Sequence, residues 1–146
     1  IGVAGYPEKH MEAASLEQDI YHLKKKVEAG ADYIVTQMFF DNQKYYDFVE
    51  KCRTSGINVP IIPGLKPITT KSQLSMIPHR FKVDLPNELV IAIAKAKDNK
   101  EVKEIGINWC IQQSKDLMKN GAPVLHYYSM GKSEVVKRIA SEVFKD

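Results

Sequence analysis

Gln37 is the residue of this sequence whose type and place most directly suggest chemistry. It is an amide within the apolar run from Ile34 to Phe40, where a buried polar group is costly unless it is hydrogen bonded. An amide carries both a donor and an acceptor, so Gln37 could bind the matching edge of a heterocycle. The alternative is that Gln37 only satisfies a neighbouring backbone group at the end of a strand.

A second polar group lies on the helix expected over residues 15–30. Spacings of three and four residues place Asp19, His22 and Lys26 on one face of that helix, with Lys25 beside them. Such a face could hold the ribose hydroxyls and the diphosphate of a dinucleotide. From the sequence alone, a solvated helix surface is the favoured interpretation.

The loop before this helix contributes Glu8 and His10. His10 could donate to a phosphate or could simply complete the loop. Glu8 and His10 do not form a metal site by themselves, and no cluster of His, Cys, Asp or Glu has metal-ligand spacing, so we expect no metal. The sequence also lacks a dinucleotide fingerprint, a P-loop, a nucleophile elbow and any defensible Ser/His/Asp or Cys/His arrangement.

Composition narrows the class of protein. The 146 residues are 44% hydrophobic and 27% charged, which is typical of a soluble globular domain. A net charge of +3 is too weak to predict binding to nucleic acid or to an anionic membrane, and no apolar run approaches the roughly 20 residues that span a bilayer. Two widely separated cysteines, Cys52 and Cys110, indicate a reducing, cytoplasmic location. The chain begins with Ile1, without a leader and apparently inside a strand, so we expect a piece of a larger protein.

The elements that must position these residues alternate along the chain. We expect apolar strands over residues 1–5, 33–40, 59–62 and 124–128. We expect helices after Ser15 and after Asp41, from Thr69 or Thr70 to Met76, from Pro86, and over residues 101–119 and 132–144. Glycine or proline ends several of these elements, and Pro63-Gly64 is expected to close the third strand.

Apolar strands separated by helices predict an α/β fold with a parallel sheet covered on both faces. Two architectures fit this pattern: a small open doubly wound sheet, or half of a (β/α)8 barrel, since a whole barrel needs about 250 residues. In either one, ligands bind beyond the carboxyl ends of the strands. That rule selects residues 6–10, 37–41, 63–67 and 128–132 as the candidate site.

Five motifs at and between these positions resemble the methylenetetrahydrofolate reductase family. They are Ala4–Ala13 (AGYPEKHMEA), Leu23–Ala31 (LKKKVEAGA), Thr36–Asp41 (TQMFFD), Ile61–Pro67 (IIPGLKP) and Leu125–Met130 (LHYYSM). They follow the family's order and spacing through essentially the whole chain. The resemblance implies that residues 1–146 form the C-terminal half of a (β/α)8 TIM barrel, with strands five to eight and their helices, and that the N-terminal half is absent.

The resemblance also implies an activity. Members of the family are flavoproteins of folate one-carbon metabolism and methionine biosynthesis. They use FAD and NAD(P)H to reduce 5,10-methylenetetrahydrofolate to 5-methyltetrahydrofolate. A reduced nicotinamide, NADH or NADPH, passes a hydride to the flavin and leaves, and the folate then takes its place. We therefore expect a small-molecule folate substrate, a cytoplasmic homo-oligomer when intact, and no nucleic-acid or membrane partner.

The family's binding residues carry over position by position. The residues matching flavin contacts are Tyr6, His10, Ala13, Asp19, His22, Lys25 and Lys26. Gln37 matches the glutamine that hydrogen-bonds the pterin, Gln73 matches a second substrate contact, and Ile77 matches an apolar wall. Lys132 stands where many relatives have arginine; it keeps the positive charge but loses the planar fork, and we retain it as a substrate-binding candidate.

Two functional parts of the family have no counterpart here. The catalytic glutamate of the first strand and the flavin-tuning aspartate after the fourth strand are missing, so we assign no catalytic residue. Glu8 matches a loop position and not the acid. We therefore expect the chain alone to be inactive. The alternative is a non-catalytic half-barrel that binds a nucleotide or a partner; an aldolase-type barrel would need a lysine on one of the four strands, and none carries one.

Overall fold

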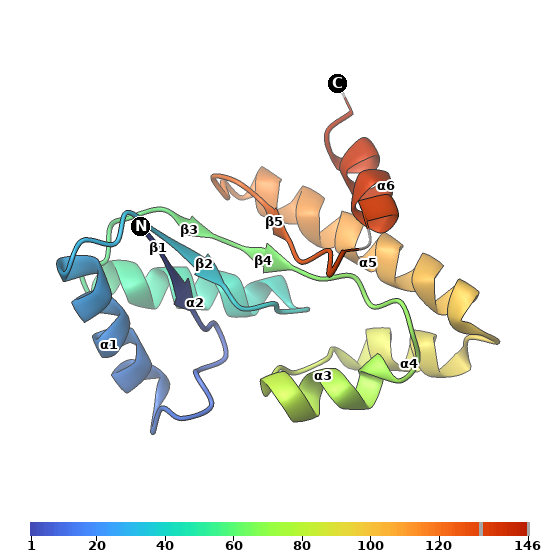
Figure 1. Ribbon diagram of the computed structural model, residues 1–146, viewed down its shortest axis with the longest axis horizontal. Coiled ribbons are helices and arrows are strands. Elements are labelled where there is room, and N and C mark those ends of the chain that lie inside the picture. Colours follow the sequence, from blue (N-terminus) through green and yellow to red (C-terminus); the bar gives the residue numbers. More distant parts are fainter. Residues whose placement is uncertain (132, 146) are drawn as a thin grey trace.

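Short parallel strands form the centre of the fold in the computed structural model, which describes residues 1–131 and 133–145 (Figure 1). The strands are β1 (Gly2–Gly5), β2 (Tyr33–Thr36), β3 (Ile61–Ile62), β4 (Gly64–Leu65) and β5 (His126–Tyr127). β1, β2 and β3 pair in that order, and β4 pairs with β5. Every pair is parallel, which confirms the predicted α/β class.

Six helices flank these strands in the described part of the chain. They are α1 (Leu16–Glu28), α2 (Asn42–Thr54), α3 (Gln73–Phe81), α4 (Asn87–Lys95), α5 (Asn99–Lys119) and α6 (Ser133–Val143). In Figure 1, α1 and α2 lie near β1 and β2, whereas α3 and α4 lie together beneath α5. No helix among the described residues is both long enough and apolar enough to cross a membrane.

Local capping explains where the long helices begin. The Ser15 hydroxyl accepts a hydrogen bond from the Gln18 N–H at 3.2 Å, and the Asp41 carboxylate accepts one from the Gln43 N–H at 2.9 Å. Both caps were predicted from the sequence and are confirmed. Asp98 caps α5 in the same way, which starts this helix two residues before the predicted boundary.

The strands are shorter than predicted, and Pro63 marks a change of pairing partner along the chain. Proline has no N–H for a sheet ladder. The Pro63 carbonyl accepts from the His126 N–H at 3.0 Å, whereas the next N–H, of Gly64, donates to the Thr36 hydroxyl at 2.9 Å. The chain thus changes its pairing partner from β2 to β5 at this residue. β3 therefore ends at Ile62, before Pro63-Gly64, as expected, and a short further strand, β4, follows and pairs with β5.

Helix α3 also departs from the prediction. It begins at Gln73 and continues through Pro78 to Phe81, whereas the expected helix starts after Thr69 or Thr70 and stops at Met76. Neither threonine caps it with a side chain; their backbone N–H groups instead donate to the Gln73 side chain.

Two apolar clusters hold the elements together. The first joins α1, α2, α5 and α6 to the strands and contains the fully buried Ile34, Phe39 and Phe48. The second joins α3, α4 and the start of α5 to residues that follow β2, among them Phe40. Helix α5 approaches the chain after β4 so closely that a Cβ on Gly106 would lie 1.8 Å from the Ile68 carbonyl oxygen.

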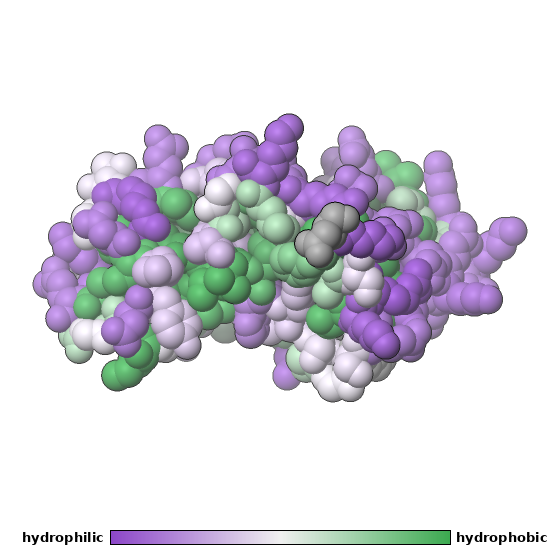
Figure 2. Space-filling model, turned by 90° about the horizontal axis from the view of Figure 1, so that it is seen from above, coloured by the Kyte–Doolittle hydropathy of each residue, from purple (hydrophilic) through white to green (hydrophobic). Residues whose placement is uncertain are grey.

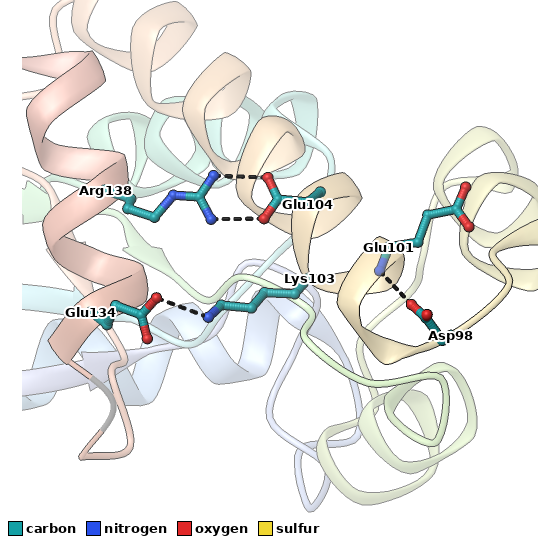
Figure 3. A network of polar contacts seen from close by, with 6 residues as sticks. All are labelled: Asp98, Glu101, Lys103, Glu104, Glu134 and Arg138. Carbon is teal, nitrogen blue, oxygen red and sulfur yellow. Dashed lines mark hydrogen bonds and ion pairs between the residues drawn. The ribbon is translucent and has the colours of Figure 1, made fainter.

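Helix α6 packs on α5 through an apolar face and two ion pairs. Val135, Ile139 and Val143 are buried. Beside them, the Arg138 guanidinium donates two parallel hydrogen bonds to Glu104, at 2.7 and 2.8 Å (Figure 3). Lys103 pairs with Glu134 at 3.2 Å. These contacts hold α6 along α5.

Candidate functional site

A cavity of about 600 Å³ opens beyond the carboxyl ends of β2, β4 and β5. Three of the four segments selected by topology contribute to its lining: residues 37–41, 63–67 and 128–132. Helix α3 and the first turn of α6 supply the remaining wall. The fourth selected segment, residues 6–10, borders a much smaller cavity whose lining overlaps that of the large one.

Gln37 directly follows β2, and the oxygen and nitrogen of its side-chain amide differ in their hydrogen bonding. Its Oε1 accepts a hydrogen bond from the Met38 N–H at 3.0 Å. This contact identifies the oxygen end, and within the described residues its Nε2 donates to no protein group. Gln37 therefore satisfies a backbone group and also presents a free donor at the cavity.

Gln73 reaches the same cavity from the first position of α3. Its Oε1 accepts from the Thr69 N–H at 2.7 Å and from the Thr70 N–H at 3.1 Å. Its Nε2, like that of Gln37, has no partner in the described part of the chain. The two glutamines thus bring two amide donors, with their acceptor ends already occupied, to one cavity.

The rest of the lining is mainly apolar. Met38, Phe81 and Val135 contribute hydrocarbon and ring surface, and Arg80 adds a cation. Tyr128, which also lines the cavity, donates through its hydroxyl to the Thr36 carbonyl at 2.7 Å, and burial raises its pKa. The arrangement is suited to a flat, partly apolar ligand that carries acceptor atoms along one edge.

Two residues expected at the substrate site need separate mention. Ile77 is fully buried in the second apolar cluster and is absent from the described cavity lining; its neighbour Met76 forms part of that wall. The role of Ile77 as an apolar wall stays a prediction, and Met76 is the residue of this turn that lines the described cavity. Lys132 lies outside the described residues.

The flavin-contact candidates of the first loop are brought together. The Tyr6 and His10 rings meet edge to face with centroids 4.6 Å apart. The His10 N–H donates to the Asp19 carboxylate at 2.8 Å, and the Ala13 N–H donates to the His10 carbonyl at 3.0 Å. This network fixes the loop against the first turns of α1.

The remaining candidates lie on the exposed side of α1. His22 and Lys26 are exposed, and no ion pair engages Lys26 in the described part of the chain. Lys25 is paired with Glu28 at 2.9 Å, a hydrogen bond that raises its pKa. The Asp19 carboxylate can accept from hydroxyls, and the His22 imidazole and the Lys26 ammonium can donate to phosphates, so these side chains fit a dinucleotide. Lys25 would have to exchange partners to join it.

Glu8 is a notable residue to which the sequence analysis gave no role. Only 10% of its side chain is exposed. Its Oε1 accepts from the Asp84 N–H at 3.1 Å and lies 3.9 Å from the Lys44 ammonium, whereas its buried Oε2 has no hydrogen-bond partner. Burial raises the pKa of this carboxyl to about 7. Residues 81–84, which are distant in the sequence, lie against Glu8. The residues next to Glu8 in the sequence therefore do not predict its burial.

Comparison with known proteins places this geometry in a family. The family model described as methylenetetrahydrofolate reductase matches residues 1–143. The chain is 38% identical over 140 residues to methylenetetrahydrofolate reductase 1 of Schizosaccharomyces pombe, covering 95% of this chain and 23% of that protein. It is 34% identical over 136 residues to the 5,10-methylenetetrahydrofolate reductase of Salmonella typhimurium, covering 92% of this chain and 46% of that enzyme.

Two further relatives differ in the donor that their names give. Methylenetetrahydrofolate reductase (NADH) 1 of Arabidopsis thaliana is 40% identical over 140 residues, covering 89% of this chain and 24% of that protein. A probable methylenetetrahydrofolate reductase (NADPH) of Caenorhabditis elegans is 36% identical over 141 residues, covering 95% and 21%. The chain therefore spans less than half the length of these relatives.

A solved structure shows the same fold. An uncharacterized protein from Clostridium thermocellum, which binds two copies of 5-methyl-5,6,7,8-tetrahydrofolic acid, aligns with a TM-score of 0.59 at 19% identity. The alignment covers 97% of this chain and 51% of that one. With the match over residues 1–143, these comparisons show that the chain belongs to the methylenetetrahydrofolate reductase family.

Proposed function

We propose that the 600 Å³ cavity binds the pterin ring of a reduced folate, as part of a methylenetetrahydrofolate reductase. The observation that carries this proposal is the convergence of Gln37 and Gln73, whose free Nε2 donors border one largely apolar cavity. The names of the relatives and the folate bound by the Clostridium protein support it. Orienting the folate ring is then the task of these two side chains.

We further propose that residues 1–146 supply the C-terminal half of a (β/α)8 barrel, strands five to eight. The chain covers 46% of the Salmonella enzyme and 51% of the Clostridium chain. In the described sheets, β1 and β5 each pair with a single neighbour, so each has an edge free for another strand. The catalytic acid would come from the other half, and this chain alone would not turn over.

The first loop and α1 would hold FAD. Tyr6, His10 and Ala13 form an ordered loop next to the Asp19 carboxylate, and the side chains of His22 and Lys26 would donate hydrogen bonds to a diphosphate. FAD, when bound, would carry hydride from NADH or NADPH to the folate. The contribution of this chain would be to bind and orient the cofactor and the folate.

We also propose that the whole protein works in the cytoplasm as a homo-oligomer. Both cysteines are free and buried, and burial raises the pKa of Cys52 and of Cys110 to about 12. Thiols in this state are unreactive and unpaired, which suits a reducing compartment.

The folate proposal is tested with Gln37→Glu in the whole protein. This change keeps an oxygen to accept from Met38 but replaces the free donor with a second acceptor. We expect isothermal titration calorimetry to show 5-methyltetrahydrofolate binding about 5- to 150-fold weaker, since a lost hydrogen bond to a buried partner costs about 1–3 kcal/mol.

The matched control is Gln18→Glu. Gln18 also accepts a backbone hydrogen bond through Oε1, from the Ala14 N–H at 3.0 Å, but it is exposed on α1. Equal weakening by both variants would contradict a specific role for Gln37. NAD(P)H oxidation by the wild-type protein, dependent on 5,10-methylenetetrahydrofolate, separates a reductase from a non-catalytic binding protein.

A further inference from the structure

Glu8 lies directly behind the wall of the large cavity. A small cavity of about 10 Å³, at the lower limit for holding one water molecule, is lined by Glu8 together with Gln37, Met38 and Phe81. The last three residues also line the large cavity. Glu8 therefore faces the rear of the surface whose front meets the ligand.

Its two carboxylate oxygens are in different situations. Oε1 accepts from the Asp84 N–H and so ties the β1–α1 loop to the chain after α3. That connection contains Lys82, which ends α3 in the left-handed conformation with φ 54° and follows Phe81 directly. Oε2 is buried without a partner. A carboxylate placed this way holds one side of the turn that carries Phe81.

The charges around Glu8 come from every element packed on it. Lys44 and Asp41 belong to α2 and its cap, Asp84 lies beyond α3, and Lys9 and Lys82 line the small cavity. Lys44 is 3.9 Å from Glu8 Oε1 and 3.6 Å from Asp84. A change in the ionisation of Glu8 thus alters a contact between three segments.

We propose that Glu8 is a positioning residue for the folate cavity: its ionised carboxylate holds the Phe81–Asp84 turn in place, and protonation loosens that wall. The proposal rests on the folate site proposed above. A hydrogen bond to an ionised acceptor is roughly twice as strong as one to a neutral acceptor, so the clamp on the Asp84 N–H weakens when Glu8 takes up a proton.

This clamp changes state near neutral pH. Burial raises the pKa of Glu8 to about 7, while the Asp84 hydrogen bond and Lys44 oppose that rise. The wild-type protein therefore passes from a clamped to a loosened wall as the pH falls from about 8 to 6. Folate affinity falls over the same interval, and folate binding near pH 7 releases a proton from Glu8.

The test compares the wild-type protein with Glu8→Gln in calorimetric titrations of 5-methyltetrahydrofolate at pH 6, 7 and 8. Glutamine keeps the size and an acceptor for Asp84 but cannot ionise. We expect the variant to bind about fivefold more weakly than the wild type at pH 8 and equally at pH 6. Glu12→Gln, which changes an exposed carboxylate of the same loop, should follow the wild type.

Two neighbouring variants move the transition in opposite directions. Asp84→Asn removes an anion that raises the pKa of Glu8, so the midpoint of the affinity change should shift to lower pH. Lys44→Met removes a cation that lowers this pKa, so the midpoint should shift upward. A purely structural role for Glu8 would move neither midpoint.

Parallel pH profiles for wild type and Glu8→Gln, or an affinity that rises as the pH falls, would overturn the proposal. Absence of folate binding at every pH would instead refute the folate site. In that case hydrogen exchange of the Asp84 amide tests whether Glu8 holds the turn. Faster exchange in Glu8→Gln than in the wild type at pH 8 would support this role, and equal exchange would refute it.

Discussion

The polarity of Gln37 and Gln73 determines what kind of ligand atom the cavity accepts. Each side chain gives its oxygen to backbone N–H groups, so the nitrogen is the end left for a ligand. A cavity with two amide donors selects acceptor atoms, such as ring nitrogens or a carbonyl oxygen. This constraint follows from backbone contacts and does not depend on any resemblance.

Replacing Glu8 with glutamine is expected to change how stability depends on pH. The pKa of this carboxyl is raised from 4.5 to about 7 in the folded protein, so the folded state keeps a proton that the unfolded chain has lost. The contribution of Glu8 to the free energy of unfolding is therefore largest below pH 4.5, because loss of the buried charge outweighs the weaker hydrogen bond to Asp84. It is lost as the pH rises to about 7, and it amounts to at most roughly 3 kcal/mol.

Urea unfolding of both proteins from pH 4 to 8 measures this effect. The wild type should lose stability relative to Glu8→Gln between about pH 4.5 and 7, and the difference should stay constant above that. A difference that grows in favour of the wild type over the same interval would show that the carboxyl is not buried as described.

Gln37 could be predicted from the sequence, whereas Glu8 could not. A polar amide in an apolar run stands out from its neighbours, and its position after a strand locates it at the ligand edge. Glu8 lies in a polar loop where a carboxylate is unremarkable. Its burial depends on segments distant in the sequence, among them the chain at Asp84, 76 residues away, whose N–H donates to it.

At the scale of elements, α5 determines where the chain after β4 runs. Gly106 lies in the middle of this helix against the backbone of Ile68, and the residues just before and after Ile68 line the cavity. A helix usually gains about 1 kcal/mol when an interior glycine becomes alanine. Here the added Cβ would meet a backbone carbonyl that no side-chain rotation can move away.

Gly106→Ala is therefore expected to destabilise the protein, by about 2 kcal/mol or more, against the intrinsic helix preference. Thermal unfolding checks the sign of the effect. An exposed helical position such as Ser141→Ala provides the control, with a change within about 0.5 kcal/mol. An increase in stability for Gly106→Ala would mean that α5 and Ile68 are further apart than the structure shows.

Elements governed by local contacts were the most predictable. The caps at Ser15 and Asp41 involve residues two or three apart and were correctly expected. The short strand β4 after Pro63 was missed because it depends on pairing with β5, more than 60 residues further along. Helix α3 continues past its expected end because buried Ile77 and partly buried Phe81 pack in the second apolar cluster on either side of Pro78.

At the scale of the whole molecule, the strands leave apolar surface exposed. Figure 2 shows apolar residues gathered across the left and middle of one face, among hydrophilic ones. Ile1, Tyr33 and Val124, at or next to strands, are 80%, 40% and 57% exposed. Free edges on β1 and β5 add unpaired backbone groups to this surface, a combination that favours association with further strands.

We therefore expect residues 1–146, expressed alone, to self-associate. Size-exclusion chromatography with light scattering should give a mass well above 16.6 kDa, or concentration-dependent aggregation. The whole protein, with the proposed other half of the barrel in place, should be monodisperse. A stable 16.6 kDa monomer of the isolated chain would contradict the half-barrel proposal.

The most direct test of the central claim is a crystal structure of the whole protein with 5-methyltetrahydrofolate. We predict the pterin ring inside the 600 Å³ cavity, with acceptor atoms of the ligand within hydrogen-bond distance of Gln37 Nε2 and Gln73 Nε2. Folate bound elsewhere with this cavity left free, or bound there without contact to either glutamine, would contradict the proposed site.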